Sequence, residues 1–353
     1  MEYEIELKLS TTGQAGALIE SHLLPELAAS VEQRELELTN SYFDTSLRDF
    51  RKNGMGLRIR GCQQTFEQTL KTAGRGVAGL QQRPEYNVAL GEKLHIAPAL
   101  PDLSLFPAEV WPTGFAVDKA QTQLQCLFVT HFTRSVYLLT FNKHSQIELV
   151  WDRGSVRAND KQETINEIEL ELKQGNVSEL FALARQLAAF MPLKIGLLSK
   201  AARGYRLLKT TTKPDTPLAE PVLSESMVNT APLADIHGYM AKYLSRWQHL
   251  INQFEVAPDE KIFSELATLW QQLCLLLEKC CQGNQTNIAQ LTADTQCFKD
   301  EWRVLLQKNI KGCESRSDGS NWSAAVDLLT GSTVMLLQLA IMQYLVEHQA
   351  LRS

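Results

Sequence analysis

The chain has 353 residues, of which 44% are hydrophobic and 21% are charged, and this length corresponds to about two domains. The composition excludes disordered, collagen-like and low-complexity proteins, because it supplies enough apolar side chains for sizeable cores. Its 35 basic and 40 acidic side chains give a net charge of −5. This charge argues against a general duplex-DNA binder and leaves room for a local basic pocket.

In the first part of the chain, period-two alternation predicts eight strands. They fall near residues 2–9, 37–44, 55–62, 65–72, 80–90, 127–141, 146–157 and 163–173. Helices are expected near 12–29, 177–190 and 199–208. Because most of the strands are joined by short connections, we expect a closed antiparallel barrel.

The chain changes character near residue 210, where three prolines within residues 210–221 indicate a linker. Beyond it, helical spacing near 232–255, 259–282, 286–309 and 321–349 predicts an all-α antiparallel bundle. We therefore expect an α+β protein with a strand-rich domain at 1–208, a Pro-rich linker at 209–230 and a helical bundle at 231–353. The acidic excess lies in the second part, so an anion site belongs more naturally to the first.

Seven cysteines without a C-x-x-C pair indicate neither a disulfide framework nor a zinc ribbon. The N-terminal residues lack the basic and apolar regions of a signal peptide. The longest apolar stretch, from Val334 to Val346, is too short to span a bilayer. We therefore expect a cytoplasmic protein without a membrane or nucleic-acid partner.

Nearly every predicted strand carries one ionic face and one apolar face. Glu4, Glu6 and Lys8 alternate with apolar residues, and alternate residues share one face of a strand. The same pattern recurs at Arg58 and Arg60, at Glu67 and Lys71, at Arg83 and Glu85, at Glu148 and Asp152, and at Glu167, Glu169 and Glu171.

This pattern leaves two arrangements open. The ionic faces are either solvated around an apolar core or turned into the barrel, with the apolar faces covered from outside. An eight-stranded barrel is just wide enough for packed side chains or a small ligand, and carboxylates inside it need cations, metals or water to compensate their burial. A lining of mixed charge would suit a polyanion held with a divalent metal.

An ordered set of motifs resembles the CYTH (triphosphate tunnel metalloenzyme) family. It begins with the Glu4-x-Glu6-x-Lys8 signature and covers about residues 1–207. The matching segments follow in family order: Met55–Arg60, Gln68–Lys71, Arg83–Tyr86, Phe132–Arg134, Ile147–Asp152, Glu167–Glu171 and Leu198–Tyr205. Within the family, the segments 79–88 and 198–205 look closest to bacterial inorganic triphosphatases.

The resemblance implies a closed tunnel that binds inorganic triphosphate and hydrolyses it to pyrophosphate and phosphate with Mg²⁺ or Mn²⁺. By position, Glu4, Glu6 and Lys8 are the catalytic candidates. The phosphate ligands would be Lys8, Arg58, Arg60, Lys71, Arg134 and Lys200, with Arg83 and Arg203 either joining them or pairing with carboxylates. The metal ligands would be Glu4, Glu6, Asp152, Glu169 and Glu171, while Glu85 and Glu148 orient basic neighbours and Glu67 and Glu167 stay open between site and solvent.

This chemistry needs positioning and charge neutralisation more than covalent help from the protein. The general base stays open between Glu6 and a lysine made neutral by crowded cations. The alternatives are a class IV adenylate cyclase, a thiamine triphosphatase of the same fold, or a non-catalytic polyphosphate-binding module.

A helical segment after a CYTH domain resembles, by position only, the arrangement in which a CHAD domain follows, and CHAD domains are associated with polyphosphate. The predicted helices contain few of the basic and histidine residues expected of CHAD, and Asp235–Arg246 is the segment that matches best. The apolar residues of the last predicted helix fit a bundle core, and an exposed remainder could form a homodimer contact.

Overall fold

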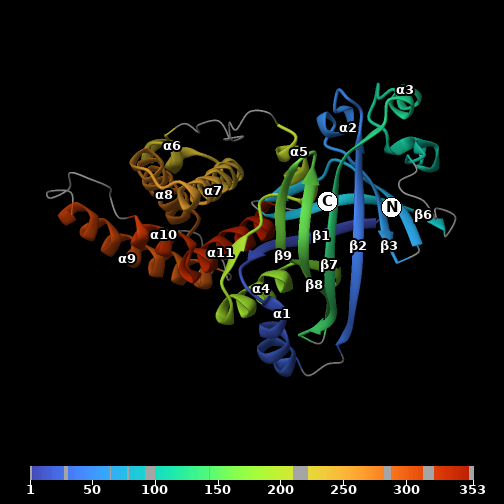
Figure 1. Ribbon diagram of the computed structural model, residues 1–353. Helices are drawn as coiled ribbons and strands as arrows, with labels where there is room; N and C mark the ends of the chain where they lie inside the picture. Colours follow the sequence, from blue (N-terminus) through green and yellow to red (C-terminus); the bar gives the residue numbers. More distant parts are fainter. Residues whose placement is uncertain are drawn as a thin grey trace. The chain divides into compact units, whose positions relative to one another are not determined.

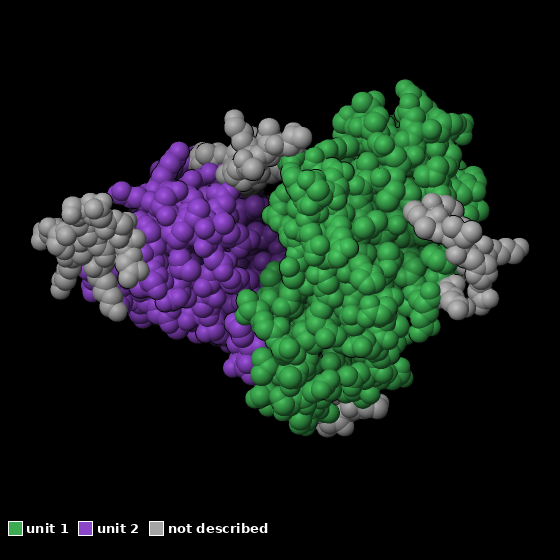
Figure 2. All heavy atoms as spheres, viewed as in Figure 1, with its two compact units in different colours: residues 1–180, 198–213 green, residues 181–197, 214–353 purple. Residues whose placement is uncertain are grey.

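The computed structural model describes residues 2–27, 31–63, 65–77, 79–91, 100–142, 144–209, 222–281, 288–312 and 322–349. The chain divides into two compact units, coloured separately in Figure 2. The first comprises Met1–Leu180 and Leu198–Lys213, and the second comprises Phe181–Leu197 and Pro214–Ser353. The chain therefore leaves the first unit, enters the second, returns to the first and leaves it again.

Eight antiparallel strands close into a barrel in the first unit (Figure 1). They are β1 (Glu2–Thr11), β2 (Glu32–Asp44), β3 (Gly56–Cys62), β4 (Thr65–Lys71), β6 (Leu80–Gly91), β7 (Gln125–Phe141), β8 (Ser145–Ala158) and β9 (Lys161–Gln174). Their order is β1-β9-β8-β7-β2-β3-β4-β6, and β6 pairs with β1 to complete the ring. A short strand, β5 (Arg75–Val77), forms a hairpin with β6. The predicted α+β class with a closed eight-stranded barrel is confirmed.

The alternation of each strand decides which way its charges point. Leu7 and Leu9 on β1 are fully buried, as are Ile168 and Leu170 on the neighbouring β9. The charged residues between them face a cavity inside the barrel. Of the two arrangements left open by the sequence, the structure therefore has the one with the charges inside.

Short helices accompany the barrel. Residues Ala15–Leu18 form α1, which passes into a π-helical turn (Ile19–Leu23) and a 3₁₀ turn (Leu24–Glu26). The helix expected near 12–29 is thus present as successive helical turns of three types over residues 15–26, and Pro25, which has no N–H to donate, lies in the final turn. The other short helices are α2 (Asp49–Lys52), α3 (Val117–Thr122) and α5 (Lys200–Leu207).

A segment between β6 and β7, for which the sequence predicts no element, packs on the barrel's apolar outside. Its 3₁₀ turns at Leu103–Leu105 and Ala108–Val110 precede α3. Trp111 and Phe115 stack on each other and pack edge-on against Phe50 of α2. This aromatic cluster covers the outer face of β3 and β4.

The second unit contains helices α6 (Glu225–Thr230), α7 (Leu233–Val256), α8 (Glu260–Cys281), α9 (Ile288–Gly312), α10 (Ser323–Thr330) and α11 (Ser332–Gln349). It also takes in most of α4 (Ser178–Phe190) and the short strand β10 (Leu193–Ile195). The helix expected over 321–349 is two helices separated at Gly331. The helix α6 lies within the range predicted as a linker, and residues 210–221 of that range lie outside the described residues.

No single helix among the described residues is long and apolar enough to cross a membrane. The pair α10 and α11, bent by 40°, meets the length and composition criteria only when taken together. Leu337, Leu339 and Ile341 of α11 are fully buried, as expected for residues in the core of a bundle.

Candidate active site

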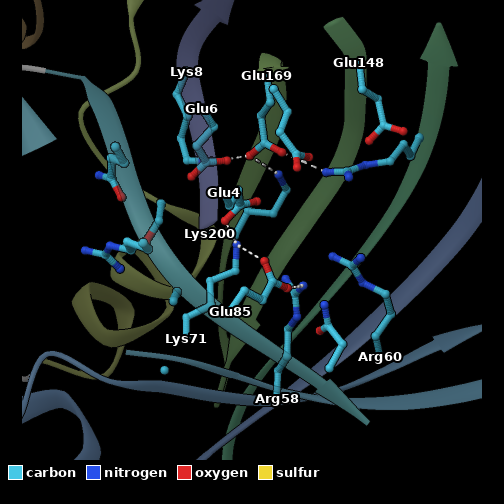
Figure 3. Close-up of a pocket in the computed structure, with 18 of the residues that line it drawn as sticks. Glu4, Glu6, Lys8, Arg58, Arg60, Lys71, Glu85, Glu148, Glu169 and Lys200 are labelled. Atoms are coloured by element: carbon cyan, nitrogen blue, oxygen red, sulfur yellow. Dashed lines mark hydrogen bonds and ion pairs between the residues drawn. The ribbon is translucent and has the colours of Figure 1, made fainter. Parts of the chain in front are cut away.

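A cavity of about 230 Å³ lies inside the barrel and is lined mostly by charged side chains. Figure 3 shows Arg58 and Arg60 on one side of it and Glu148 and Glu169 on another. The predicted site residues on its wall are Glu4, Glu6, Lys8, Arg58, Arg60, Lys71, Arg83, Arg134, Glu169, Glu171 and Lys200, together with Glu67, Glu85 and Glu148. Asp152, Glu167 and Arg203 lie behind this wall, buried among its ion pairs.

The first strand contributes two carboxylates and one ammonium group. Lys8 Nζ lies 2.9 Å from Glu6 Oε2 and also contacts Glu169, while Glu4 contacts Lys71 across the cavity. Burial alone would lower the pKa of Lys8, but Glu169 and Glu6 raise it well above its ordinary value. Lys8 is therefore protonated, which disfavours it as a neutral general base.

A second network joins α5 to the barrel wall. Lys200 Nζ lies 2.5 Å from both Asp152 and Glu167 and 3.1 Å from Glu169. Arg134 binds both Asp152 oxygens at 2.7 Å and Glu169 at 2.8 Å. Burial would raise the pKa of Asp152, but Arg134 and Lys200 lower it. Glu167, left open by the sequence, is 1% exposed and therefore not solvated.

The position of α5 depends on Asp44, which was not among the site residues predicted from the sequence. Tyr205 of α5 donates a hydrogen bond to Asp44 Oδ2 at 2.7 Å, and Asp44 also accepts from the backbone N–H groups of Phe50 and Arg51. Gly204 packs so closely on Phe128 that a Cβ would overlap the ring. These contacts fix the helix that presents Lys200. The sequence signal that could have identified Asp44 is an aspartate at the end of a strand, shortly before a short helix, where such side chains commonly cap the helix N-terminus.

An arginine cluster gives one side of the cavity an excess of positive charge. Arg58 lies 3.3 Å from Glu85, which also lies 3.2 Å from Lys71, so Glu85 contacts basic neighbours as expected. Burial and the nearby Arg58 and Arg134 lower the pKa of Arg60 to about 10. Within the described part of the chain, the buried Nε of Arg58 has no hydrogen-bond partner. Donors in this state suit an anion with several oxygen atoms.

Carboxylates crowd another part of the cavity. Burial raises the pKa of Glu171, Glu4 and Glu148 add to the shift and Lys173 opposes it, so that the resulting pKa is about 7. Carboxylates that repel one another in this way suit a hard divalent cation, which prefers oxygen ligands. Asp152, Glu167 and Glu169 also bring their oxygens within 4.8 Å of one another, but Arg134, Lys200 and Arg203 already neutralise them. The residues present therefore fit a metal ion, and the Glu4 and Glu171 region fits it better.

The closed barrel and its mixed-charge interior define a tunnel built to enclose a small charged ligand. A sequence profile of the CYTH domain matches residues 2–205. That match covers more than half of the chain, so the chain belongs to the CYTH family.

A curated relative and two solved structures are similar to this chain. An inorganic triphosphatase of Haemophilus influenzae is 38% identical over 208 residues, which are 59% of this chain and 55% of that relative. This chain thus matches about half of the relative's length. A proposed adenylyl cyclase from Hippeastrum with a dominant triphosphatase activity is 16% identical, with 57% of this chain and 95% of that chain covered and a TM-score of 0.40.

A proposed adenylate cyclase from Bacillus halodurans is 18% identical, with 57% of this chain and 98% of that chain covered and a TM-score of 0.35. The family assignment rests on the profile match over residues 2–205.

Proposed function

We propose that this protein hydrolyses inorganic triphosphate to pyrophosphate and phosphate inside the tunnel. One observation carries the proposal: the enclosed cavity combines Arg60, which forms no ion pair among the described residues and is repelled by Arg58 and Arg134, with a separate group of carboxylates around Glu171, whose pKa is raised. A polyanion and a divalent cation together would satisfy both. The similarity to an inorganic triphosphatase over 208 residues supports this substrate.

Each group of residues has a distinct task in this proposal. Arg58, Arg60 and Arg134 bind and orient phosphate oxygens, because planar guanidinium groups match them geometrically. Lys8, Lys71 and Lys200 add charge, each held in place by a carboxylate. Enclosure of the substrate limits access of bulk water and strengthens these interactions.

We propose Mg²⁺ or Mn²⁺ as the cofactor, held by Glu4, Glu6 and Glu171, with Asp152 and Glu169 as further predicted ligands. When bound, such an ion supplies neutralisation of phosphate charge and a lowered pKa for bound water. Because Lys8 is held in its protonated form, Glu6 is the better candidate to accept the proton of the attacking water. Its carboxylate lies 6% exposed beside Lys8.

The decisive experiment is phosphate release from tripolyphosphate with and without Mg²⁺ or Mn²⁺, beside ATP, thiamine triphosphate and long-chain polyphosphate. We expect metal-dependent turnover of tripolyphosphate and little of the others. Cyclisation of ATP at a matching rate would identify an adenylate cyclase, and binding without any turnover would identify a polyphosphate-binding module. Glu4→Gln should abolish turnover while the fold is retained.

For the helical unit, we propose a CHAD-like module, supported only by its position after the CYTH match and its helical content. A homodimer through this unit and a cytoplasmic location are also proposals. Light scattering of the purified chain tests the dimer, since a monomer at micromolar concentration would contradict it. Binding of long-chain polyphosphate to the protein with an inactivated tunnel tests the CHAD-like role.

A further inference from the structure

Asn40 lies in the wall of the tunnel between two neighbouring strands. It pairs in register with Thr130 on β7 and with Arg60 on β3. Its fully buried side chain accepts a hydrogen bond from Arg60 Nε at 3.0 Å and donates one to Thr130 Oγ1 at 2.9 Å. Since a guanidinium group can only donate, the amide orientation is fixed by chemistry: its oxygen faces Arg60 and its NH₂ group faces Thr130.

This neutral partner sets Arg60 apart from most basic residues of the site. Ion pairs with carboxylates are formed by Lys8, Arg58, Lys71, Arg134, Lys200 and Arg203. Among the residues that the structure describes, Arg60 forms none, and it also faces repulsion from Arg58 and Arg134. An amide oxygen carries only a partial charge, so Asn40 orients the guanidinium group without neutralising it.

We propose that Asn40 is a positioning residue that sets the anion affinity of the tunnel. It holds Arg60 in place while leaving its full charge available to a phosphate group. A carboxylate at this position would instead bind Arg60 permanently and lower the positive potential that a polyanion meets. This inference deepens the proposed function and rests on the binding of triphosphate at the same site.

The isosteric variant Asn40→Asp tests the inference, because it changes the charge and hardly the shape. The new carboxylate can still accept from Arg60, and the Thr130 hydroxyl can rotate to donate, so no buried polar atom loses its partner. We expect a higher Tm for the ligand-free protein and tripolyphosphate binding weaker by about tenfold or more. Calorimetric titration with tripolyphosphate in EDTA measures the affinity without turnover.

Asn87 offers a matched control. It lines the cavity, and its oxygen accepts a hydrogen bond from Thr69 at 2.8 Å rather than from an arginine. Asn87→Asp therefore adds the same charge to the cavity wall without an arginine partner, and should leave Tm unraised. In an Arg60→Gln background, Asn40→Asp should no longer raise Tm, because its ion-pair partner is missing.

Two results would overturn the inference. One is an affinity of Asn40→Asp for tripolyphosphate that stays within about twofold of wild type, since the added charge should weaken binding by about tenfold or more. The other is a fall in Tm, which would indicate a merely structural role. Failure of the proposed function would look different from failure of this inference. Wild type would then not hydrolyse tripolyphosphate, while Asn40→Asp would still bind it more weakly than wild type does.

Discussion

At the scale of single residues, Glu169 illustrates how the tunnel organises its charges. Its carboxylate contacts Lys8, Arg134 and Lys200. Burial would raise its pKa, but these three cations lower it well below the ordinary value. Buried ion pairs seldom add much net stability, because lost hydration offsets the attraction. The role of Glu169 is therefore to fix three cations, from two strands and a helix, around one point.

Arg58→Ala should mainly weaken substrate binding. The Arg58 side chain is 12% exposed and lies beside Glu85, so its removal takes away a phosphate-binding charge and leaves that carboxylate to repel the substrate. We expect a loss of about 2–5 kcal/mol, seen as a raised KM for tripolyphosphate. The matched control is Arg153→Ala, which removes an arginine stacked on Trp151 outside the cavity lining. An unchanged KM in Arg58→Ala would contradict binding in the tunnel.

The sequence predicted the charged residues of the site better than the neutral ones that hold them. Alternating charges are conspicuous in a strand, and the family resemblance supplied their direction. Asn40 and Asp44 on β2 carry no such signal, because their partners Thr130 and Tyr205 lie far away along the chain. Contacts of this kind depend on the register of the closed barrel, which local sequence patterns do not specify.

At the scale of elements, the short helix α5 links the barrel to the candidate active site. Ser199 caps its N-terminus by accepting a hydrogen bond from the backbone N–H of Ala202 at 3.1 Å. Tyr205 then ties its last turn to Asp44, while Lys200 reaches the carboxylates of β8 and β9. The sequence placed this helix correctly, because its cap and its lysine motif are local. The segment between β6 and β7 escaped prediction because its packing depends on aromatic contacts with α2.

Gly204→Ala should displace α5. The added methyl group would overlap the Phe128 ring, and overpacking of this kind costs about 1–3 kcal/mol. We expect a lower Tm and a lower kcat for tripolyphosphate, since Lys200 moves with the helix. Gly238→Ala in α7 is the matched control: open space surrounds its Cβ position, so it should raise stability by about 0.5–1 kcal/mol. Equal behaviour of the two variants would refute close packing at Gly204.

At the scale of the whole molecule, the chain passes from the first compact unit to the second, back to the first and into the second again. Residues 181–197 group with the helices of the second unit, although the CYTH match runs through them to residue 205. Arg185 of α4 lies 2.8 Å from Asp294 of α9 and donates to the Leu336 carbonyl oxygen of α11. A stretch near the end of the family segment is thus part of the helical unit. Dividing the sequence at the change from strand-like to helical patterns did not predict this.

Asp294→Asn should destabilise the helical unit. Asp294 is 8% exposed, and the variant keeps its shape while removing the negative charge opposite Arg185. Leaving a buried charged group poorly paired costs about 1–3 kcal/mol, measurable by chemical denaturation. Glu278→Gln is the comparison, because Glu278 is largely exposed in its pair with Lys299 and such pairs contribute about 0–1 kcal/mol. Equal losses would argue against an important link between α4 and α9.

His237 should make the helical unit sensitive to acid. Burial and the neighbouring His348 lower the pKa of His237 below its ordinary value of 6.5. The unfolded chain therefore binds a proton more readily than the fold does, so stability is lost as pH falls through 6.5. His237→Gln should reduce this dependence, and its Tm should improve relative to wild type between pH 8 and pH 5.5. Parallel Tm curves for the two proteins would contradict the assignment.

The way the barrel closes has a consequence for how the protein is made. The strand β1 pairs with β6 and β9, so its two neighbours are synthesised long after it. The charged side chains of Glu4, Glu6 and Lys8 therefore stay exposed to water until residue 174 has left the ribosome, and Lys200 is synthesised later still. Pairings so distant in sequence make folding slow, and strands left without partners invite association between nascent chains. The ring that encloses the cavity therefore stays open until residue 174, the end of β9, has been synthesised.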